Sequence, residues 1–503
     1  MIADLVVVGR SIHPGAAAAG PGFVAVAGNR IIAVDTTDAS PDAFIGARTD
    51  VVDARAATVV AGLHDNHVFF TSQLLEHGGL DVATLSDEEV GAAARTATSA
   101  GRSLAVRGVD AARAVTLVAA AEDENVYCDL VAIAHERTAI VATRAATQRL
   151  GELDPGSNES LHALYAQLAD DEGAVQAAFA AAAERMHRGG VVSVKDIAFD
   201  THLGMLPAID RMLTNGTLAL RYAFASQAVA AVPDLDAGAA WAGRPGARFH
   251  GYKLMTDGSF DELTAELLPP DDRWRRAQHA EVDYEALATQ AQRVLAAGFR
   301  LALNADGDGA ARACIEVFED FAQHGTLPAG CSLSDASLVD AIDAGRLGRL
   351  GIGVETYPQL LRYPGYDRAL MEELLGAHRG ERLGNFAAML ASGVAVTAGT
   401  DFPLFNPSLP EAMLSASERV LGDGDVAARW VTGNAVSRDA VVAMWTTVAA
   451  RAMGQPGEWG VLAPGAAADL VVYDRELLHA RPEELLDAVP ALVLADGRVV
   501  HAA

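Results

Sequence analysis

The sequence predicts an α/β protein built as a (β/α)8 TIM barrel, with a small β-sandwich domain assembled from both chain ends. Two observations lead to this fold. Apolar, strand-like runs alternate with alanine-rich helical segments through the middle of the chain, as in parallel sheets with crossover helices. Both ends consist instead of short β runs between turn residues. We therefore expect a composite β domain at 1–58 plus 455–503 and the barrel at 59–454.

The two chain ends share the same β texture. The amino-terminal runs are Leu5–Val8, Phe23–Val26, Arg30–Val34 and Val51–Asp53, and the carboxyl-terminal runs are 469–473, 491–494 and 497–500. Short runs of this kind cannot bury a face alone, so we expect the two ends to pair into one domain.

The central region carries about eight strand–helix units. The predicted strands are Val59–Gly62, Leu130–Ala134, Val191–Val194, Leu218–Phe224, Gly251–Met255, Arg300–Asn304, Ile352–Tyr357 and Ala395–Gly399. The predicted helices include Glu88–Ala100, Ala174–Arg188, Tyr284–Ala297 and Ala310–His324. A barrel of this kind has its active site at the carboxyl ends of the strands. We expect the stretch from Thr71 to Gly190 to be compact and to leave the pocket open.

Composition excludes several classes of function. The chain has 503 residues and a formal net charge of −28, which argues against nucleic acid and anionic membrane surfaces as partners. It has no apolar run long enough to span a membrane and no signal-peptide pattern. Three cysteines, Cys128, Cys314 and Cys331, lack CxxC spacing and are expected in the core. We expect a cytoplasmic protein that acts on a small molecule.

The segment Gly-Leu-His-Asp-Asn-His-Val-Phe-Phe at 62–70 indicates an altered metal site. It follows an apolar run, and residues two apart on a strand point the same way. A His-x-His pair here would aim two imidazoles at one metal ion, but the two positions are His67 and Phe69. Phenylalanine has no lone pair to donate, and its ring fills the space that a metal would need.

Several ordered motifs resemble the amidohydrolase superfamily, in particular the branch that contains N-substituted formamide deformylases. The motifs are Gly-Val-Val-Ser-Val-Lys-Asp at 190–196, Lys-Leu-Met-Thr-Asp-Gly-Ser at 253–259, Asn-Ala-Asp-Gly-Asp at 304–308, Ser-Asp-Ala-Ser-Leu-Val-Asp at 334–340, Gly-Thr-Asp-Phe-Pro at 399–403 and the stretch 460–470. The resemblance covers nearly the whole chain. It implies a barrel with a β domain from both ends, hydrolysis of a C–N bond and a binuclear metal centre, and it leaves a homo-oligomer open.

The family's metal ligands are altered in this chain. The resemblance places them at His67, Phe69, Lys253, Asn304, Asp335 and Asp401, where Lys253 matches a carboxylated lysine that bridges two metals. Three of the four histidine positions are not histidine. Zinc, which favours nitrogen and sulfur ligands, would lose most of its donors. We therefore expect no metal cofactor; the alternative is one divalent ion, zinc, manganese or magnesium, held by His67, Asp401 and Asp335.

We assign the catalytic acid/base roles to Lys253, Asp335, Asp401 and His67, because paired carboxylates beside an amine and an imidazole can divide these roles. Without metals, Lys253 is expected as a free amine rather than a carbamate. A further set of residues is expected to bind substrate: Asn304, Phe69, Glu355, Tyr357 and Asp257. Phe69 could equally be a cavity filler, and Glu355 and Tyr357 could equally be packing or ion-pair residues.

Three hypotheses for the function remain open. The first is a metal-independent enzyme that acts on an amide, formamide or cyclic amide, by hydrolysis, elimination or cyclisation. The second is a hydrolase in which a single remodelled metal site activates water. The third is a non-catalytic descendant that binds a ligand in the old pocket. Catalysis is favoured because the altered positions did not simply become apolar, and buried polar groups without a use are costly.

Overall fold

The computed structural model describes residues 1–503 except 16–17, 124–128, 157–158, 230–231, 261–262 and 269–281. Its centre is an eight-stranded sheet in which every paired neighbour is parallel. The strands in chain order are β5 (Leu63–Val68), β10 (Val191–Phe199), β11 (Arg221–Gln227), β12 (Arg248–Leu254), β13 (Leu301–Asn304), β14 (Ser332–Ser334), β15 (Gly353–Thr356) and β16 (Val396–Ala398). The predicted α/β barrel is confirmed.

The first and last strands close the barrel through backbone hydrogen bonds. The amide of Asp401 donates to the carbonyl of His67 at 2.9 Å, and the amide of Phe69 donates to the carbonyl of Phe402 at 2.9 Å. Gly399 permits this approach, because a Cβ there would lie 2.6 Å from the Cβ of His67. The closure therefore holds the carboxyl ends of β5 and β16 side by side.

Two predicted barrel strands are corrected, and one barrel strand was not predicted. The run Val59–Gly62 lies mostly in β4 (Asp50–Ala61), which pairs in the β domain, so the first barrel strand is β5. The run Leu130–Ala134 is a strand, β8, but it belongs to a separate sheet. The sixth barrel strand, β14, is only three residues long and too short for the apolar pattern to show.

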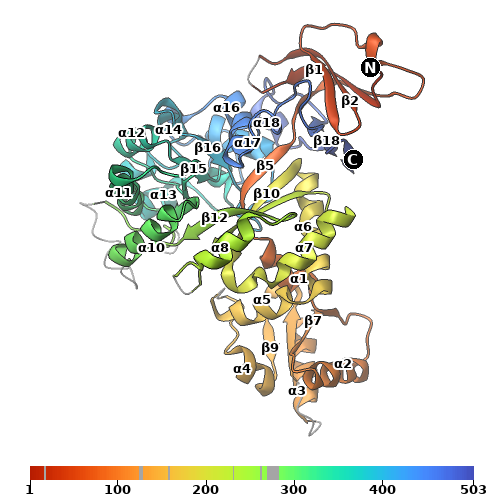
Figure 1. Cartoon of the computed structure of the whole chain (residues 1–503), viewed down its shortest axis with the longest axis vertical. Coiled ribbons are helices and arrows are strands. Elements are labelled where there is room, and N and C mark those ends of the chain that lie inside the picture. Colours follow the sequence, from red (N-terminus) through yellow and green to blue (C-terminus); the bar gives the residue numbers. More distant parts are fainter. Residues whose placement is uncertain (16–17, 124–128, 157–158, 230–231, 261–262, 269–281) are drawn as a thin grey trace.

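The chain ends meet in one β domain, as predicted. Its seven strands are hydrogen-bonded in the order β19-β18-β17-β4-β1-β2-β3. Besides β4, these strands are β1 (Leu5–His13), β2 (Gly20–Ala27), β3 (Arg30–Asp35), β17 (Leu470–Tyr473), β18 (Pro490–Ala495) and β19 (Arg498–Ala502). Val7 and Val24 from the first half share one core with Leu470 and Leu494 from the second. Figure 1 shows both termini in this part of the molecule.

The stretch from Thr71 to Gly190 was expected to be compact, but it forms a folded unit of its own. It contains a four-stranded sheet, β6 (Leu80–Asp81), β7 (Leu104–Val109), β8 and β9 (Ile140–Ala142), with its own hydrophobic core. Figure 1 shows this unit projecting from the barrel on the side away from the β domain. Because its apolar strands have a separate core, the alternation pattern wrongly assigned Leu130–Ala134 to the barrel.

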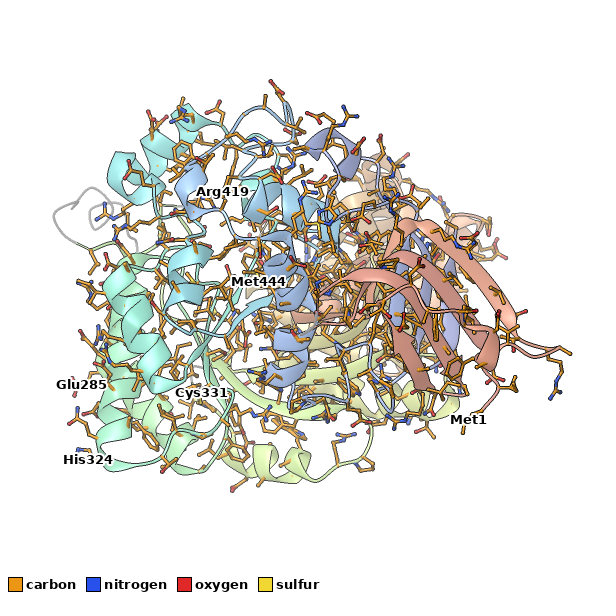
Figure 2. The ribbon with its side chains drawn as sticks, turned by 90° about the horizontal axis from the view of Figure 1, so that it is seen from above. Met1, Glu285, His324, Cys331, Arg419 and Met444 are labelled. Atoms are coloured by element: carbon orange, nitrogen blue, oxygen red, sulfur yellow. The ribbon has the colours of Figure 1, made fainter. Side chains whose placement is uncertain are left out.

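Helices surround the barrel and cover the inserted sheet. They are α1 (Leu74–His77), α2 (Asp87–Ser99), α3 (Ala111–Asp123), α4 (Arg144–Leu150), α5 (His162–Ala169), α6 (Glu172–Arg188), α7 (Leu206–Asn215), α8 (Leu235–Ala242), α10 (Tyr284–Ala296), α11 (Asp308–His324), α12 (Ala341–Leu350), α13 (Arg368–Gly380), α14 (Phe386–Ala391), α15 (Leu409–Ala412), α16 (Arg438–Trp445), α17 (Thr447–Ala452) and α18 (Pro482–Leu485). In Figure 2, Glu285 of α10 and His324 of α11 lie at the edge opposite Met1. No helix in the described ranges is long and apolar enough to cross a membrane.

Two of the three cysteines are core residues, as expected. Cys314 and Cys331 are buried and free. Cys128 lies outside the described residues.

The buried carboxylate of Asp65 fastens the barrel closure from inside. It accepts hydrogen bonds from the Thr400 hydroxyl at 2.6 Å, the Thr400 amide at 3.1 Å and the His67 amide at 3.1 Å. Burial raises its pKa to about 7, although these hydrogen bonds oppose the rise. One side chain on β5 thus fixes the backbone on both sides of the closure.

Replacing Thr400 with valine tests this fastening. Thr400→Val removes the donor at 2.6 Å and leaves a buried carboxylate oxygen short of a partner. We expect the free energy of unfolding in urea to fall by about 1–3 kcal/mol. The matched control is Thr116→Val on α3, whose exposed hydroxyl donates only to the carbonyl of Ala112; it should change stability by less than about 0.5 kcal/mol. Equal losses in the two variants would contradict this role.

Candidate active site

The predicted catalytic side chains converge at the carboxyl ends of the barrel strands. His67 and Lys253 are the last inward-facing residues of β5 and β12. Asp335 directly follows β14, and Asp401 lies in the turn after β16, beyond Gly399 and Thr400. A cavity of about 560 Å³ opens at this end, and its lining includes Lys253, Asp335 and Asp401. A cavity of this volume can enclose a small molecule.

Both site aspartates have left-handed backbone conformations. The φ angle is 60° at Asp335 and 51° at Asp401. Such angles are uncommon outside glycine and carry a small conformational cost, which aspartate tolerates better than most residues. Both aspartates line the cavity at these turns.

The four predicted catalytic residues form one charged cluster. The Lys253 Nζ lies 2.8 Å from Asp335 Oδ2 and 3.3 Å from His67 Nε2. The same imidazole nitrogen lies 3.6 Å from Asp335 Oδ1 and 3.8 Å from Asp401 Oδ1. His67 and Lys253 are buried, so the electrostatic interactions within this cluster are only weakly screened by water.

The two carboxylates differ in their affinity for a proton. Burial acts to raise the pKa of Asp335, but Lys253, His67 and the hydrogen bond from Tyr357 outweigh it and hold that pKa well below its usual range. Burial also raises the pKa of Asp401; His67 opposes this, Asp335 adds to it, and the net shift is upward. Two acids whose environments push their pKa values apart can divide the acid and base roles.

A second ion pair lies behind His67. Lys195 of β10 donates a hydrogen bond to Glu355 of β15, which also accepts one from Ser332 at 2.7 Å. The other carboxylate oxygen of Glu355 lies 3.6 Å from His67 Nδ1. Burial lowers the pKa of Lys195 and would raise that of Glu355, but the charge of Lys195 keeps the Glu355 pKa well below normal. The pair therefore faces the rear of the imidazole with negative charge.

Three residues predicted to bind substrate are placed behind the cavity wall. Glu355 contacts His67 as described, and the Tyr357 hydroxyl donates to Asp335. Asp257 accepts the backbone amides of Asp306, Gly307 and Glu266 at 2.8–3.0 Å, so it clamps the loops after β12 and β13. These side chains contact other protein groups and are not part of the described cavity lining.

Asn304 and Phe69 do line the cavity. The Asn304 amide nitrogen lies 3.2 Å from the Asp257 carbonyl, to which it donates. The Phe69 ring stacks on Phe199 with centroids 5.9 Å apart, and Lys253 Nζ lies 5.7 Å from its centroid. Phe69 thus presents a face to the cavity and contacts the lysine.

The donor set fits one divalent ion better than two. His67, Asp335 and Asp401 each offer one ligand atom, and these atoms lie within 4.8 Å of one another. One imidazole and two carboxylates are an acceptable set for zinc or manganese. A second ion would lack nitrogen ligands, because Phe69 has no lone pair to donate and the Asn304 amide nitrogen donates to Asp257. The geometry of these donors therefore does not support the expectation that no metal binds.

Sequence reasoning missed the residues that build the rest of the pocket. Arg137, His162 and Tyr165 come from the inserted stretch before β10. Phe199 is the last residue of β10, and His202 lies in the 3₁₀ turn that follows it. The sequence gives no signal for the first three, which are far from any motif. The sequence did contain a signal for Lys195: a lysine inside an apolar strand and next to Asp196 indicates a buried charge that needs a partner.

The sequence matches the amidohydrolase family over residues 50–501, nearly the whole chain. This chain belongs to the amidohydrolase family. The barrel, the composite β domain and the strand-end site agree with that membership. The finer resemblance to formamide deformylases stays a prediction.

Individual relatives are distant. A 5-methylthioadenosine/S-adenosylhomocysteine deaminase of Symbiobacterium thermophilum is 33% identical over 126 residues, which are 23% of this chain and 28% of that enzyme. An uncharacterized metal-dependent hydrolase of Pyrococcus horikoshii superposes with a TM-score of 0.68 at 18% identity, over 95% of this chain and 99% of the other. An atrazine chlorohydrolase of Arthrobacter aurescens, complexed with zinc, gives 0.55 at 14% identity, over 99% and 95%. These structures establish the likeness of fold.

Substitutions of Lys195 and Glu355 test whether this buried ion pair stabilises the barrel. Lys195→Met leaves a buried carboxylate without its cation, so we expect the free energy of unfolding to fall by about 3–5 kcal/mol. Replacing both residues, as Lys195→Met with Glu355→Leu, should recover much of that loss.

The control is the exposed pair Arg188–Glu184 on α6. Arg188→Met should lower stability by less than about 1 kcal/mol. A Lys195→Met loss as small as that of Arg188→Met would show that the buried pair does not support the barrel. So would a double variant that is no more stable than Lys195→Met alone.

Proposed function

We propose that this chain hydrolyses a C–N bond of a small amide, formamide or cyclic amide, and that it does so without the binuclear metal centre of its family. The single observation that carries this proposal is the position of Lys253. Its Nζ lies 2.8 Å from Asp335 and 3.3 Å from His67, among the groups that would otherwise meet a metal. An ammonium there supplies positive charge where a metal-dependent relative uses a cation.

The roles follow from the positions of the charges. Asp401, at the cavity and with a raised pKa, takes the proton from an attacking water molecule. The C–O bond forms, and Lys253 stabilises the negative charge that develops on the carbonyl oxygen. Asp401 then returns the proton to the leaving nitrogen as the C–N bond breaks. Asp335 stays ionised and orients Lys253, while His67 separates the two carboxylates.

A second candidate is a hydrolase with one metal ion, which the cluster of His67, Asp335 and Asp401 supports. When bound, such an ion supplies Lewis-acid activation of the water or the carbonyl. These three residues would hold it, and Lys253 would then lie close to it as a second positive charge. Partners of either form are small-molecule substrates, and we propose a cytoplasmic location, which cell fractionation would test.

Removing the proposed base should abolish turnover. Asp401→Asn is expected to lower kcat by about 10²–10⁴-fold on the best substrate from a panel of N-formyl amines, amides and cyclic imides, with KM changed far less. The control is Asp236→Asn, an exposed aspartate in the first turn of α8, which should keep full activity. Full turnover by Asp401→Asn would refute this assignment. No turnover by the wild type on the whole panel would favour a binding protein.

Metal content separates the two candidates. We expect protein purified without added metal or chelator to contain far less than one equivalent of any transition metal, and to keep its rate after treatment with EDTA and dialysis. About one equivalent of a single metal, lost together with activity and restored by zinc, manganese or magnesium, would establish the one-metal form instead. In that case His67→Asn should lower the metal content.

A further inference from the structure

One side of the cavity is walled by aromatic rings that the proposed reaction does not use. Phe69 and Phe199 stack at 5.9 Å with 29° between their planes. His162 packs edge-on against Phe199 at 4.6 Å, and His202 lies 5.2 Å from both Phe199 and Tyr165. All five rings line the same cavity as Lys253 and Asp401. The wall therefore adjoins the reacting groups.

Arg137 adds a positive charge to this wall. It ends a short 3₁₀ turn in the inserted unit and donates to the Tyr165 hydroxyl at 3.0 Å and the Pro155 carbonyl at 3.3 Å. Within the described part of the chain, no carboxylate forms an ion pair with Arg137. Glu76 lines the same region, but it is exposed to water. An arginine has five N–H donors in a planar fork, so donors remain for a ligand.

The cavity mouth is also apolar. Met255 and Leu404 line it and are 48% and 46% exposed, although large apolar side chains usually avoid water. They belong to the loops after β12 and β16, on the rim next to Lys253 and Asp401. An apolar rim, an aromatic wall and one arginine together describe a ligand that is flat, hydrophobic and acidic at one end.

We propose that the aromatic wall formed by Phe69, Phe199, His162, Tyr165 and His202 binds an aryl group of the substrate, and that Arg137 binds a carboxylate attached to it. The substrate class would be an aromatic acid derivative that carries the C–N bond. This assignment rests on the proposed function for the scissile bond only; the binding of the aryl acid itself does not depend on catalysis. Aromatic rings favour other rings over saturated ones because their edges and faces carry opposite partial charges.

The test uses three small probes: phenylacetate, cyclohexylacetate and phenylacetamide. Their dissociation constants are measured on the wild-type protein by ligand-observed NMR. Phenylacetate should bind about fivefold more tightly than cyclohexylacetate, which has the same charge but no aromatic ring. It should also bind about tenfold more tightly than phenylacetamide, which has the ring but no charge. Equal affinities within either pair would overturn the corresponding half of the proposal.

Matched variants locate the two preferences. Phe199→Leu should remove the preference for the aromatic ring, and Arg137→Gln should remove the preference for the charge. Phe321→Leu on α11, outside the cavity, should change neither. Phe69→Leu repeats the ring test if Phe199→Leu melts at a lower temperature than the wild type. If Phe199→Leu keeps the preference for the ring and Arg137→Gln keeps the preference for the charge, the binding site lies elsewhere. Loss of either preference in Phe321→Leu would have the same meaning.

The same titrations on Asp401→Asn keep this inference separate from the proposed function. Binding preferences that persist there, with turnover lost, support both. Turnover of amides without any preference for phenylacetate would refute the aryl-acid site and leave the hydrolase. Preferences that persist in a wild-type protein without amide turnover would support the site and refute the hydrolase.

Discussion

The centre of this barrel depends on the pairing of charges that are taken out of water. Two lysines, on β10 and β12, lie buried among carboxylates from the following strands. An isolated buried ammonium would lose several kcal/mol of hydration free energy, so each needs a partner at contact distance. Lys195 has Glu355 and Lys253 has Asp335, and His67 lies between the two pairs. The position of the imidazole follows from charges on both of its sides.

This pairing of charges is compatible with the altered metal-ligand positions that the family resemblance implies. A metal-binding barrel gathers imidazoles and carboxylates around a cation, and their mutual repulsion is relieved by that cation. The family resemblance places an aromatic ring, Phe69, at one ligand position, an amide, Asn304, at another and a carboxylate, Asp335, at a third. Lys253 offsets the charge of Asp335, and Phe69 faces the same ammonium at 5.7 Å. The substitutions are therefore consistent with one another as a set, because each suits a fixed ammonium.

The sequence predicted the strand-end residues well, because parallel strands end at one rim and ordered motifs located the strand ends. The structure brings Lys253, Asn304, Asp335 and Asp401 to the lining of one cavity, with His67 beside three of them. Sequence reasoning failed for Leu130–Ala134, since a buried strand has the same apolar pattern in a barrel and in an inserted sheet. It left Glu355 and Tyr357 open between substrate binding and packing or ion pairing, because alternation tells which residues point inward but not how deep they lie. Arg137 and Tyr165 could not be predicted, because a pocket wall supplied by an insertion depends on tertiary packing.

The division of labour between barrel and insertion has a physical consequence. The reacting groups lie on strands whose backbone is fixed by closure of the barrel and by Asp65. The aromatic wall joins Phe69 and the end of β10 to α5, which packs on the barrel core, and Arg137 comes from a turn of the inserted stretch. Within the described residues, the hydrogen bonds of Arg137 and Tyr165 do not involve the charge pairs, so we expect substitutions at these two positions to leave the pairs in place. Because Arg137 and Tyr165 lie outside the barrel strands, we expect the specificity of such a barrel to change at these positions while its charged centre stays the same.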